Sequence, residues 1–213
     1  GTYTITSTAT TSTFRYRVTN TAPCTTSDAV VTVNVLTSPT AGTGSSTSVC
    51  DNSTTAINLF GMLTGEDAGG TWTRASGTGG TFNATAGTYT PAAGATTSTF
   101  NYMVGGSGCP VDNELVTINI TPQAIAGTGG SATDCAGSNN TITLSTLIMG
   151  GQTGGTWTRL TGTGGTFTGG TTGSYVITST ATTSTFRYIV TGTAPCVNST
   201  ADVTVNITSS PTA

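Results

Sequence analysis

The sequence predicts an all-β chain made of small β-sandwiches in tandem, each about 85 residues long. First, the hexapeptide Gly-Gly-Thr-Trp-Thr-Arg at 69–74 returns unchanged at 154–159, 85 positions later, and self-similarity at a fixed period is typical of repeat architectures. Second, 56 of the 213 residues are Thr and 30 are Gly, and both residue types disfavour helices. Third, apolar and polar residues alternate with period two in several short stretches, which predicts strands with one buried face.

Residues 1–40 are predicted to be the C-terminal half of a truncated repeat, because residues 1–41 differ from residues 173–213 at only 11 positions. Two strands are expected in this half, each with its apolar residues on one face. Those residues are Phe14, Tyr16 and Val18 in the first strand, and Val31, Val33 and Val35 in the second. Since a pair of strands is marginally stable in water, we expect this half to pack with strands from upstream sequence or from another chain.

Residues 41–123 and 124–213 are predicted to be two complete repeats. Each has a short leading strand ending at Cys, an Ile-x-Leu strand, the Trp strand, two short strands carrying Phe and Tyr, an aromatic strand and a final Val/Ile strand. The markers of the first repeat are Cys50, Ile57, Leu59, Trp72, Phe82, Tyr89, Phe100, Tyr102, Val116 and Ile118. Those of the second repeat are Cys135, Ile142, Leu144, Trp157, Phe167, Tyr175, Phe186, Tyr188, Val203 and Val205.

This element order is typical of an immunoglobulin-like sandwich. Each repeat offers about seven short strands, separated by turn signals every 8 to 12 residues or so, with a Trp on the third strand and an aromatic pair on the sixth. The Trp supplies one large apolar body on which both sheets can pack. The predicted core aromatic residues are Trp72, Trp157, Phe14, Tyr16, Phe100, Tyr102, Phe186 and Tyr188.

The five cysteines predict disulfides, and therefore an oxidising compartment. Cys50 and Cys135 hold equivalent positions before the Ile-x-Leu strand, whereas Cys24, Cys109 and Cys196 hold equivalent positions between the last two strands. The simplest pairing lies within each repeat and joins Cys50 to Cys109 and Cys135 to Cys196. Cys24 would then find its partner outside the segment. A bridged loop of about 60 residues would stabilise each repeat by roughly 4 kcal/mol.

A second pairing stays open, in which Cys50 of one repeat bonds Cys196 of the next. If seven strands are joined by strict hairpins, the first turn and the last hairpin lie at opposite poles of a sandwich. A bridge within one repeat would then require a very short leading strand or a crossover.

The composition argues against catalysis, cofactors, metal ions and nucleic acid. The chain has no His, which removes an imidazole base, and its eight acidic residues mostly fail to recur between repeats. A net charge of −3 disfavours phosphate binding. We expect no membrane span in this segment, since no apolar run approaches the roughly 18 to 20 residues required.

The two Trp residues have two interpretations. The one we favour places Trp72 and Trp157 in the cores. The alternative makes them exposed platforms that stack on glycans, with Arg74 and Arg159, two residues further on, as contacts. In a regular strand each Arg shares the face of its Trp, so we expect the guanidinium over the edge of the indole.

Five motifs together resemble a known group of proteins. They are a Cys before an Ile/Leu strand, Gly-Gly-Thr-Trp in mid-repeat, Thr-Phe-x-Tyr-x-Val near the end, a loop Cys, and Val-Thr-Val-Asn-Val. The whole chain resembles the tandem PKD-like and immunoglobulin-like repeats of large Bacteroidota cell-surface adhesins, of the kind exported by the type 9 system and used in gliding. The resemblance implies an extracellular stalk or filament at the cell surface, whose partners are neighbouring repeats or other copies of the chain. It supplies no catalytic residues.

Overall fold

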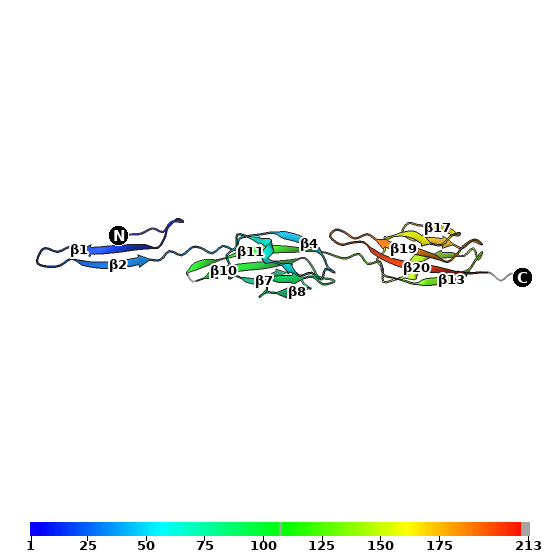
Figure 1. Ribbon diagram of the computed structural model, residues 1–213, viewed down its shortest axis with the longest axis horizontal. Helices are drawn as coiled ribbons and strands as arrows, with labels where there is room; N and C mark the ends of the chain where they lie inside the picture. The colour runs from blue at the N-terminus through cyan, green and yellow to red at the C-terminus, as the bar shows by residue number, and fades with distance from the viewer. Residues whose placement is uncertain (107, 210–213) are drawn as a thin grey trace.

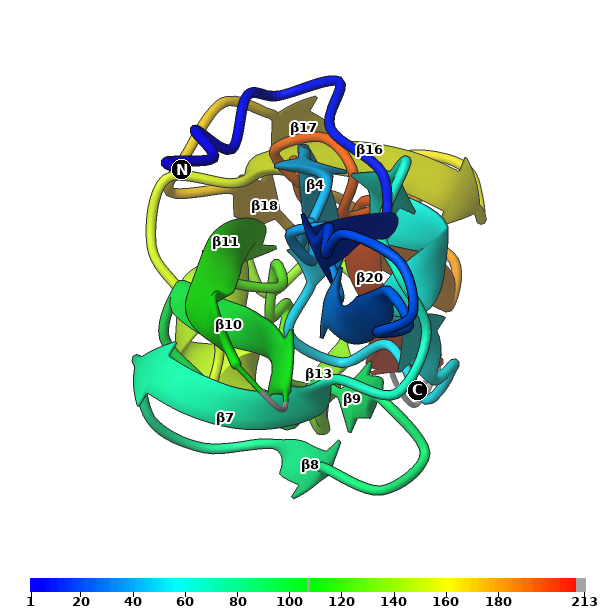
Figure 2. The same cartoon turned by 90° about the vertical axis from the view of Figure 1, so that its left-hand side faces the viewer.

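The computed structural model describes residues 1–106 and 108–209 and shows three bodies in a row (Figure 1). A β-hairpin comes first and two β-sandwiches follow, with the N-terminus in the hairpin body. The all-β prediction is confirmed, because the described residues form strands and two short 3-10 helices but no α-helix. None of the described helices has the length and apolar character needed to cross a membrane. Figure 2 views the same row along its long axis.

The first sandwich (β3 to β11) contains a four-stranded, a three-stranded and a two-stranded sheet. The four-stranded sheet has the order β4-β11-β10-β7, the three-stranded sheet β5-β9-β8, and the two-stranded sheet β3-β6. The elements are β3 (Thr43–Gly44), β4 (Ser46–Cys50), β5 (Ile57–Asn58), η1 (Phe60–Met62), β6 (Leu63–Thr64), β7 (Thr71–Ser76), β8 (Thr81–Asn83), β9 (Thr88–Thr90), β10 (Ser98–Gly106) and β11 (Cys109–Thr121). All pairs are antiparallel except β4 with β11, which is parallel.

The second sandwich (β12 to β20) repeats this topology strand by strand. Its sheets have the orders β13-β20-β19-β16, β14-β18-β17 and β12-β15, with β13 parallel to β20. The elements are β12 (Thr128–Gly129), β13 (Ser131–Cys135), β14 (Thr141–Thr143), η2 (Leu144–Leu147), β15 (Ile148–Met149), β16 (Thr156–Thr161), β17 (Thr166–Thr168), β18 (Ser174–Val176), β19 (Ser184–Val190) and β20 (Ser199–Thr208).

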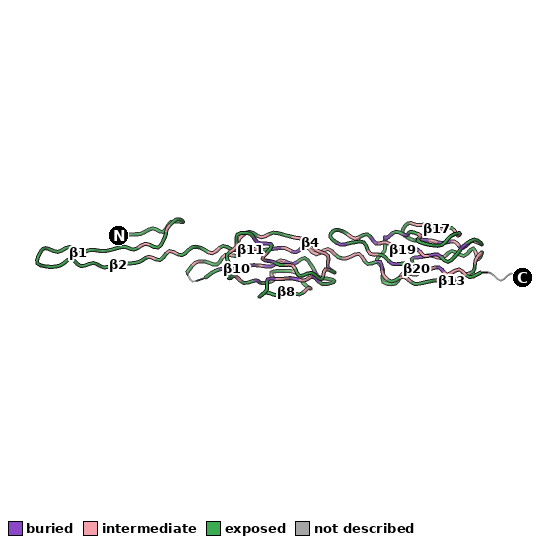
Figure 3. The backbone as a smooth tube through the Cα atoms, in the orientation of Figure 1, coloured by how far each residue is buried: buried purple, intermediate pink, exposed green. Residues whose placement is uncertain are grey.

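Each sandwich has its own apolar core, built around the Trp of the repeated hexapeptide. Trp72 on β7 is 3% exposed and Trp157 on β16 is 4% exposed. The ring centroids of Trp157 and Tyr188 lie 4.9 Å apart, and those of Trp72 and Tyr102 lie 5.0 Å apart. In β19 every second residue is buried, as the period-two alternation predicts. Figure 3 shows the buried segments concentrated in the two sandwiches.

The hairpin of β1 (Ser12–Val18) and β2 (Ser27–Val33) has no second sheet over it in the described part of the chain. Phe14 is 42% exposed and Tyr16 is 71% exposed, so the prediction that these two rings belong to a core is wrong for residues 1–40. The reason is that this stretch has no counterpart of β14 and β17 of the opposite sheet, and residues 2–4, which correspond to β18, do not form a strand. That strands from elsewhere cover this face stays a prediction.

The repeated Gly-Gly-Thr-Trp motif is explained by a tyrosine that fastens the loop before the Trp strand. The hydroxyl of Tyr188 donates to the carbonyl of Gln152 (2.7 Å) and accepts from the amide of Gly155 (2.9 Å). A Cβ on Gly155 would come within 2.6 Å of the Tyr188 ring, and Gly154 has a φ of +89°. Both glycines are therefore needed for the loop to pass under the ring.

We expect Tyr188→Phe to lower the free energy of unfolding of the second sandwich by about 1–3 kcal/mol, because it leaves the buried Gly155 amide without its acceptor. Denaturant unfolding followed by Trp fluorescence measures the change. The matched control is Tyr16→Phe in the exposed hairpin, which should leave both sandwiches unaffected. An unchanged unfolding midpoint for the Tyr188 variant would show that the hydrogen bonds of this hydroxyl do not stabilise the sandwich.

Candidate functional site: the joint between the sandwiches

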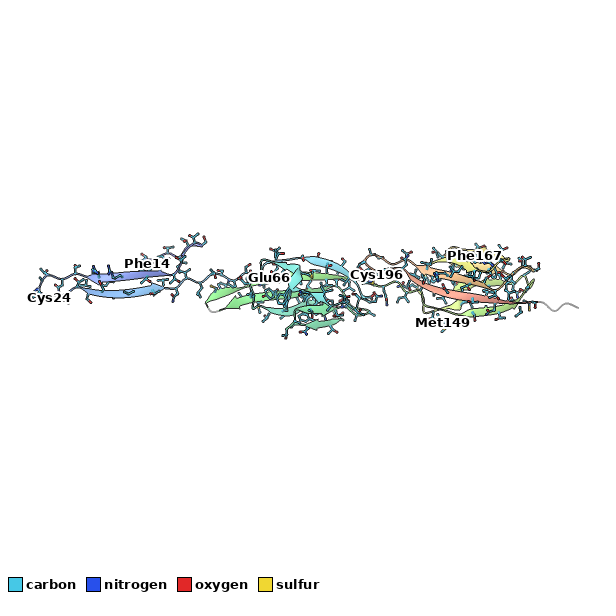
Figure 4. All side chains as sticks on the ribbon, in the orientation of Figure 1. Phe14, Cys24, Glu66, Met149, Phe167 and Cys196 are labelled. Carbon is cyan, nitrogen blue, oxygen red and sulfur yellow. A yellow bond between two sulfur atoms is a disulfide. The ribbon has the colours of Figure 1, made fainter. Side chains whose placement is uncertain are left out.

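The two sandwiches are linked by a disulfide between Cys50 and Cys196, which stand 146 positions apart in the sequence. Cys50 is the last residue of β4, and Cys196 lies in the loop between β19 and β20. Their Cα atoms are 5.0 Å apart, within the range that disulfides adopt. Figure 4 places Cys196 where the second sandwich faces the first. The bond therefore crosses from one repeat to the next.

The predicted pairing within each repeat, Cys50 with Cys109 and Cys135 with Cys196, is wrong. Because β4 runs parallel to β11, Cys50 stands opposite Thr121, at the end of β11, whereas Cys109 begins that strand. The strand has 13 residues, so its ends lie roughly 40 Å apart, far beyond the Cα separation of about 7 Å that a disulfide tolerates. The pairing between repeats, left open by the sequence, is the one present. Cys24, Cys109 and Cys135 are free thiols.

Asp51 attaches the start of the linker between the two sandwiches, residues 122–127, to the first sandwich. Its carboxylate is buried and accepts hydrogen bonds from the amides of Gln123 (3.0 Å) and Gly94 (3.3 Å). Its own amide donates to the carbonyl of Thr121 (3.0 Å). Since burying a carboxylate is costly unless hydrogen bonds compensate, this arrangement holds the linker against the pole of the sandwich beside the disulfide.

The second sandwich fastens the other end of the linker. The amide of Ile125 donates to Oε1 of Gln152 (3.0 Å), and the amide of Gln152 donates back to the carbonyl of Ile125 (2.8 Å). The amide of Ala126 donates to Oγ of Ser199 (3.0 Å). Both ends of a short linker are thus hydrogen-bonded to the body that they adjoin, and the disulfide adds a third attachment.

The connection between the hairpin and the first sandwich uses the same positions with different side chains. The amide of Thr40 donates to Oδ2 of Asp67 (2.9 Å), and the amide of Ala41 donates to Oδ2 of Asp112 (2.9 Å). Asp67 and Asp112 take the places that Gln152 and Ser199 hold in the second sandwich. The attachment of the second end of the linker is therefore common to both connections, although the acceptor is a carboxylate in one case and an amide or hydroxyl in the other.

The expected contact between each Arg and the edge of its Trp is not present. The Cζ atom of Arg74 lies over the Tyr89 ring, 5.0 Å from its centroid, and that of Arg159 lies 5.2 Å from the centroid of Tyr175. Arg159 also donates to the carbonyl of Gly164 (2.8 Å). Sheet register pairs Arg74 with Phe100 and Arg159 with Phe186, so each guanidinium also lies over the ring of its cross-strand partner, at 5.4 and 5.7 Å.

The structure does not support the alternative in which Trp72 and Trp157 are exposed platforms for glycans. Trp72 and Trp157 are buried in the cores, and sugar stacking requires an open ring face. Arg74 and Arg159 extend over buried rings and do not form an exposed patch with the indoles. In the described part of the chain no three His, Cys, Asp or Glu side chains come together in a way that could hold a metal ion.

The strongest charge pairs lie on the outer faces of hairpins, away from the joint. Nε of Arg187 is 2.7 Å from Oδ1 of Asp202, and this hydrogen bond lowers the pKa of the Asp202 carboxyl below its ordinary value. Arg17 holds the pKa of Asp28 down in the same way, at 2.8 Å. Ion pairs that are this exposed contribute little to stability, so they favour the strand register without forming a chemical site.

Comparison with known proteins gives the fold but no family. No family model and no curated protein matches the chain. Among solved structures, the chain is similar to the three-immunoglobulin structure of titin domains I67–I69 in an E-to-A variant, with a TM-score of 0.50, 8% identity and coverage of 93% of this chain and 75% of that one. It also aligns with protocadherin gamma C5 EC1–3 (TM-score 0.43, 11% identity, 93% and 78% covered) and with mouse cadherin-23 EC22–24 (TM-score 0.38, 13% identity, 96% and 76% covered). At these identities the likeness to titin shows the fold alone, which is a tandem array of immunoglobulin-like sandwiches.

Proposed function

We propose that the chain is a structural segment of a long extracellular repetitive adhesin or surface filament, in which the sandwiches form a stalk or adhesive fibre without catalysis. The observation that carries this proposal is the joint, where a disulfide and a linker hydrogen-bonded at both ends hold one sandwich on the next. A row of bodies fastened in this way keeps its direction over distance, as a stalk must. The disulfide fits an oxidising compartment.

The path of the chain supports an extended array. It enters the first sandwich beside the hairpin, leaves at the opposite pole through Thr121, and enters the second sandwich directly (Figure 1). Because entry and exit lie at opposite poles, additional repeats lengthen the row and do not fold back on it. We take 41–123 and 124–213 as the repeating units and 1–40 as the second half of a preceding one. The partners of the chain are then neighbouring repeats or other copies of it.

Imaging of the native material tests this function. Antibodies raised against the chain should label thin fibres that project from intact cells of the source, and isolated fibres should show beads of sandwich size arranged head to tail. Pre-immune serum on the same cells is the control for non-specific labelling. Label confined to the cell interior, or to compact particles at the surface, would contradict the proposal.

A further inference from the structure

Three cysteines are free although each occupies a position whose counterpart in the array is bonded. Cys135 ends β13 as Cys50 ends β4. Cys24 lies in the loop between β1 and β2, as Cys196 lies in the loop between β19 and β20, and Cys109 is the first residue of β11, directly after the corresponding loop. Besides the bonded pair, the chain therefore contains one free strand-end cysteine and two free cysteines at the loop position.

The end of the second sandwich reproduces the bonding around Cys50. Cys135 stands opposite Thr208 in parallel register, as Cys50 stands opposite Thr121. The carbonyl of Cys135 accepts from the amide of Ser138 (3.2 Å), and that of Cys50 accepts from the amide of Ser53 (3.0 Å). Cys135 is exposed. The backbone of Cys135 therefore makes the same pairing and turn hydrogen bonds as that of Cys50, and its thiol is solvent-exposed at the far end of the second sandwich.

The loop position is reproduced in the hairpin. The amide of Cys24 donates to the carbonyl of Thr21 (3.1 Å), and the amide of Cys196 donates to that of Thr193 (2.8 Å). Both loops read Thr-Ala-Pro-Cys, and Figure 4 places Cys24 at the outer tip of the hairpin.

Cys109 lies against the preceding body of the row, as Cys196 does. Its Sγ is 3.5 Å from the carbonyl oxygen of Thr37, which follows the second strand of the hairpin. In the joint that is formed, Sγ of Cys196 is 3.2 Å from the carbonyl oxygen of Thr121, at the end of β11. The thiol of Cys109 therefore lies one residue past Leu36, and Leu36 is the residue opposite which a strand-end cysteine of the preceding repeat would stand.

We propose that the Cys50–Cys196 bond is one rung of a ladder of disulfides in which every strand-end cysteine is bonded to the loop cysteine of the next sandwich. Cys135 is the site for the loop cysteine of a following sandwich of the same repeat. Cys109 and Cys24 are the sites that bond the strand-end cysteines of the sandwiches preceding them. This inference depends on the joint and not on the location of the protein at a cell surface.

The bond forms by ordinary thiol–disulfide exchange. The thiolate of one cysteine attacks a small-molecule disulfide such as oxidised glutathione, and the second cysteine then displaces the small thiol from the mixed disulfide. Two thiols of the protein lose two protons and two electrons, and the oxidant is reduced to two thiols. The structure contributes the approach of the two sulfur atoms, which the linker fixes.

An extended chain tests the ladder. A second copy of residues 127–213 is placed directly after Ala213, so that the segment Ser209-Ser-Pro-Thr-Ala213 leads into Gly127 as Thr37-Ser-Pro-Thr-Ala41 leads into Gly42. After refolding with oxidised and reduced glutathione, non-reducing peptide mapping should find Cys135 bonded to the loop cysteine of the added unit, at the same occupancy as Cys50–Cys196. The added copy brings two cysteines, yet the number of free thiols should stay at three.

Two variants of the extended chain serve as controls. Cys135→Ser should abolish the new bond, raise the free thiols by one relative to the extended parent, and leave Cys50–Cys196 intact. Cys24→Ser should leave the new bond in place. The ladder is overturned if Cys135 stays free, if it bonds Cys196 of its own sandwich, or if it bonds the strand-end cysteine Cys135 of a second chain.

Discussion

Reduction of the Cys50–Cys196 disulfide is expected to lengthen the fully unfolded chain by roughly 500 Å when it is pulled from its two ends. The bond joins residues that are 146 positions apart, so in the oxidised chain the tension passes from Cys50 to Cys196 and bypasses everything between them. Residues 51–195 then cannot extend, and they are released on reduction at about 3.3–3.6 Å each. Single-molecule force spectroscopy with and without a reductant measures the difference in contour length.

Two substitutions make this experiment specific. Cys50→Ser should give the long contour in oxidising buffer as well, because it removes the bond and leaves Cys196 free. Cys135→Ser removes a thiol that is free in the chain and should keep the short contour. Equal contour lengths for the oxidised chain and the Cys50 variant would show that the bond between the sandwiches is not formed in solution.

Replacing Trp157 by Ala is expected to destabilise the second sandwich by about 3–5 kcal/mol while the first sandwich keeps its stability. Truncation of a buried Trp removes its transfer free energy and leaves a cavity, and this loss is a large part of the 5–15 kcal/mol typical of a whole domain. The cores of the two sandwiches share no residue, so the effect should stay in one of them. Denaturant unfolding followed by far-UV circular dichroism should separate into two transitions.

The chain supplies its own reporters and control for this substitution. With only two Trp residues, the fluorescence of the Trp157 variant comes from Trp72 and reports the first sandwich alone, and Trp72→Ala gives the reciprocal experiment. Leu160→Ala lies on the same strand as Trp157 but is 43% exposed, and it should change stability by little. Loss of both transitions in the Trp157 variant would mean that the sandwiches do not fold separately.

The repeat and its strands could be predicted from the sequence because the signals for them are local. The hexapeptide around Trp72 fixes the period, and the alternation in stretches such as Phe186-x-Tyr188-x-Val190 identifies the strands that cross a core. The burial of Trp72 and Trp157 was expected from their place in mid-repeat. These inferences need no knowledge of which strands are neighbours.

The joint could not be predicted to the same degree, because it depends on strand direction. The sequence shows that Cys50 and Cys135 are equivalent, but nothing local indicates that β4 lies parallel to β11 and ends beside Thr121. That single pairing decides which pole carries the strand-end cysteine, and so decides the disulfide. The contacts of Arg74 were missed for a related reason, since the partner ring of Tyr89 belongs to the opposite sheet.

A covalent link between Cys50 and Cys196 also changes what backbone cleavage does to the array. A proteinase that hydrolyses one peptide bond anywhere between these two residues produces two fragments that remain connected through sulfur. The loops between β5 and β19 all lie inside this interval, so cleavage of one of them does not release the distal part of the chain. In surroundings rich in secreted proteinases, the row would be severed by a single cut only outside the bridged interval.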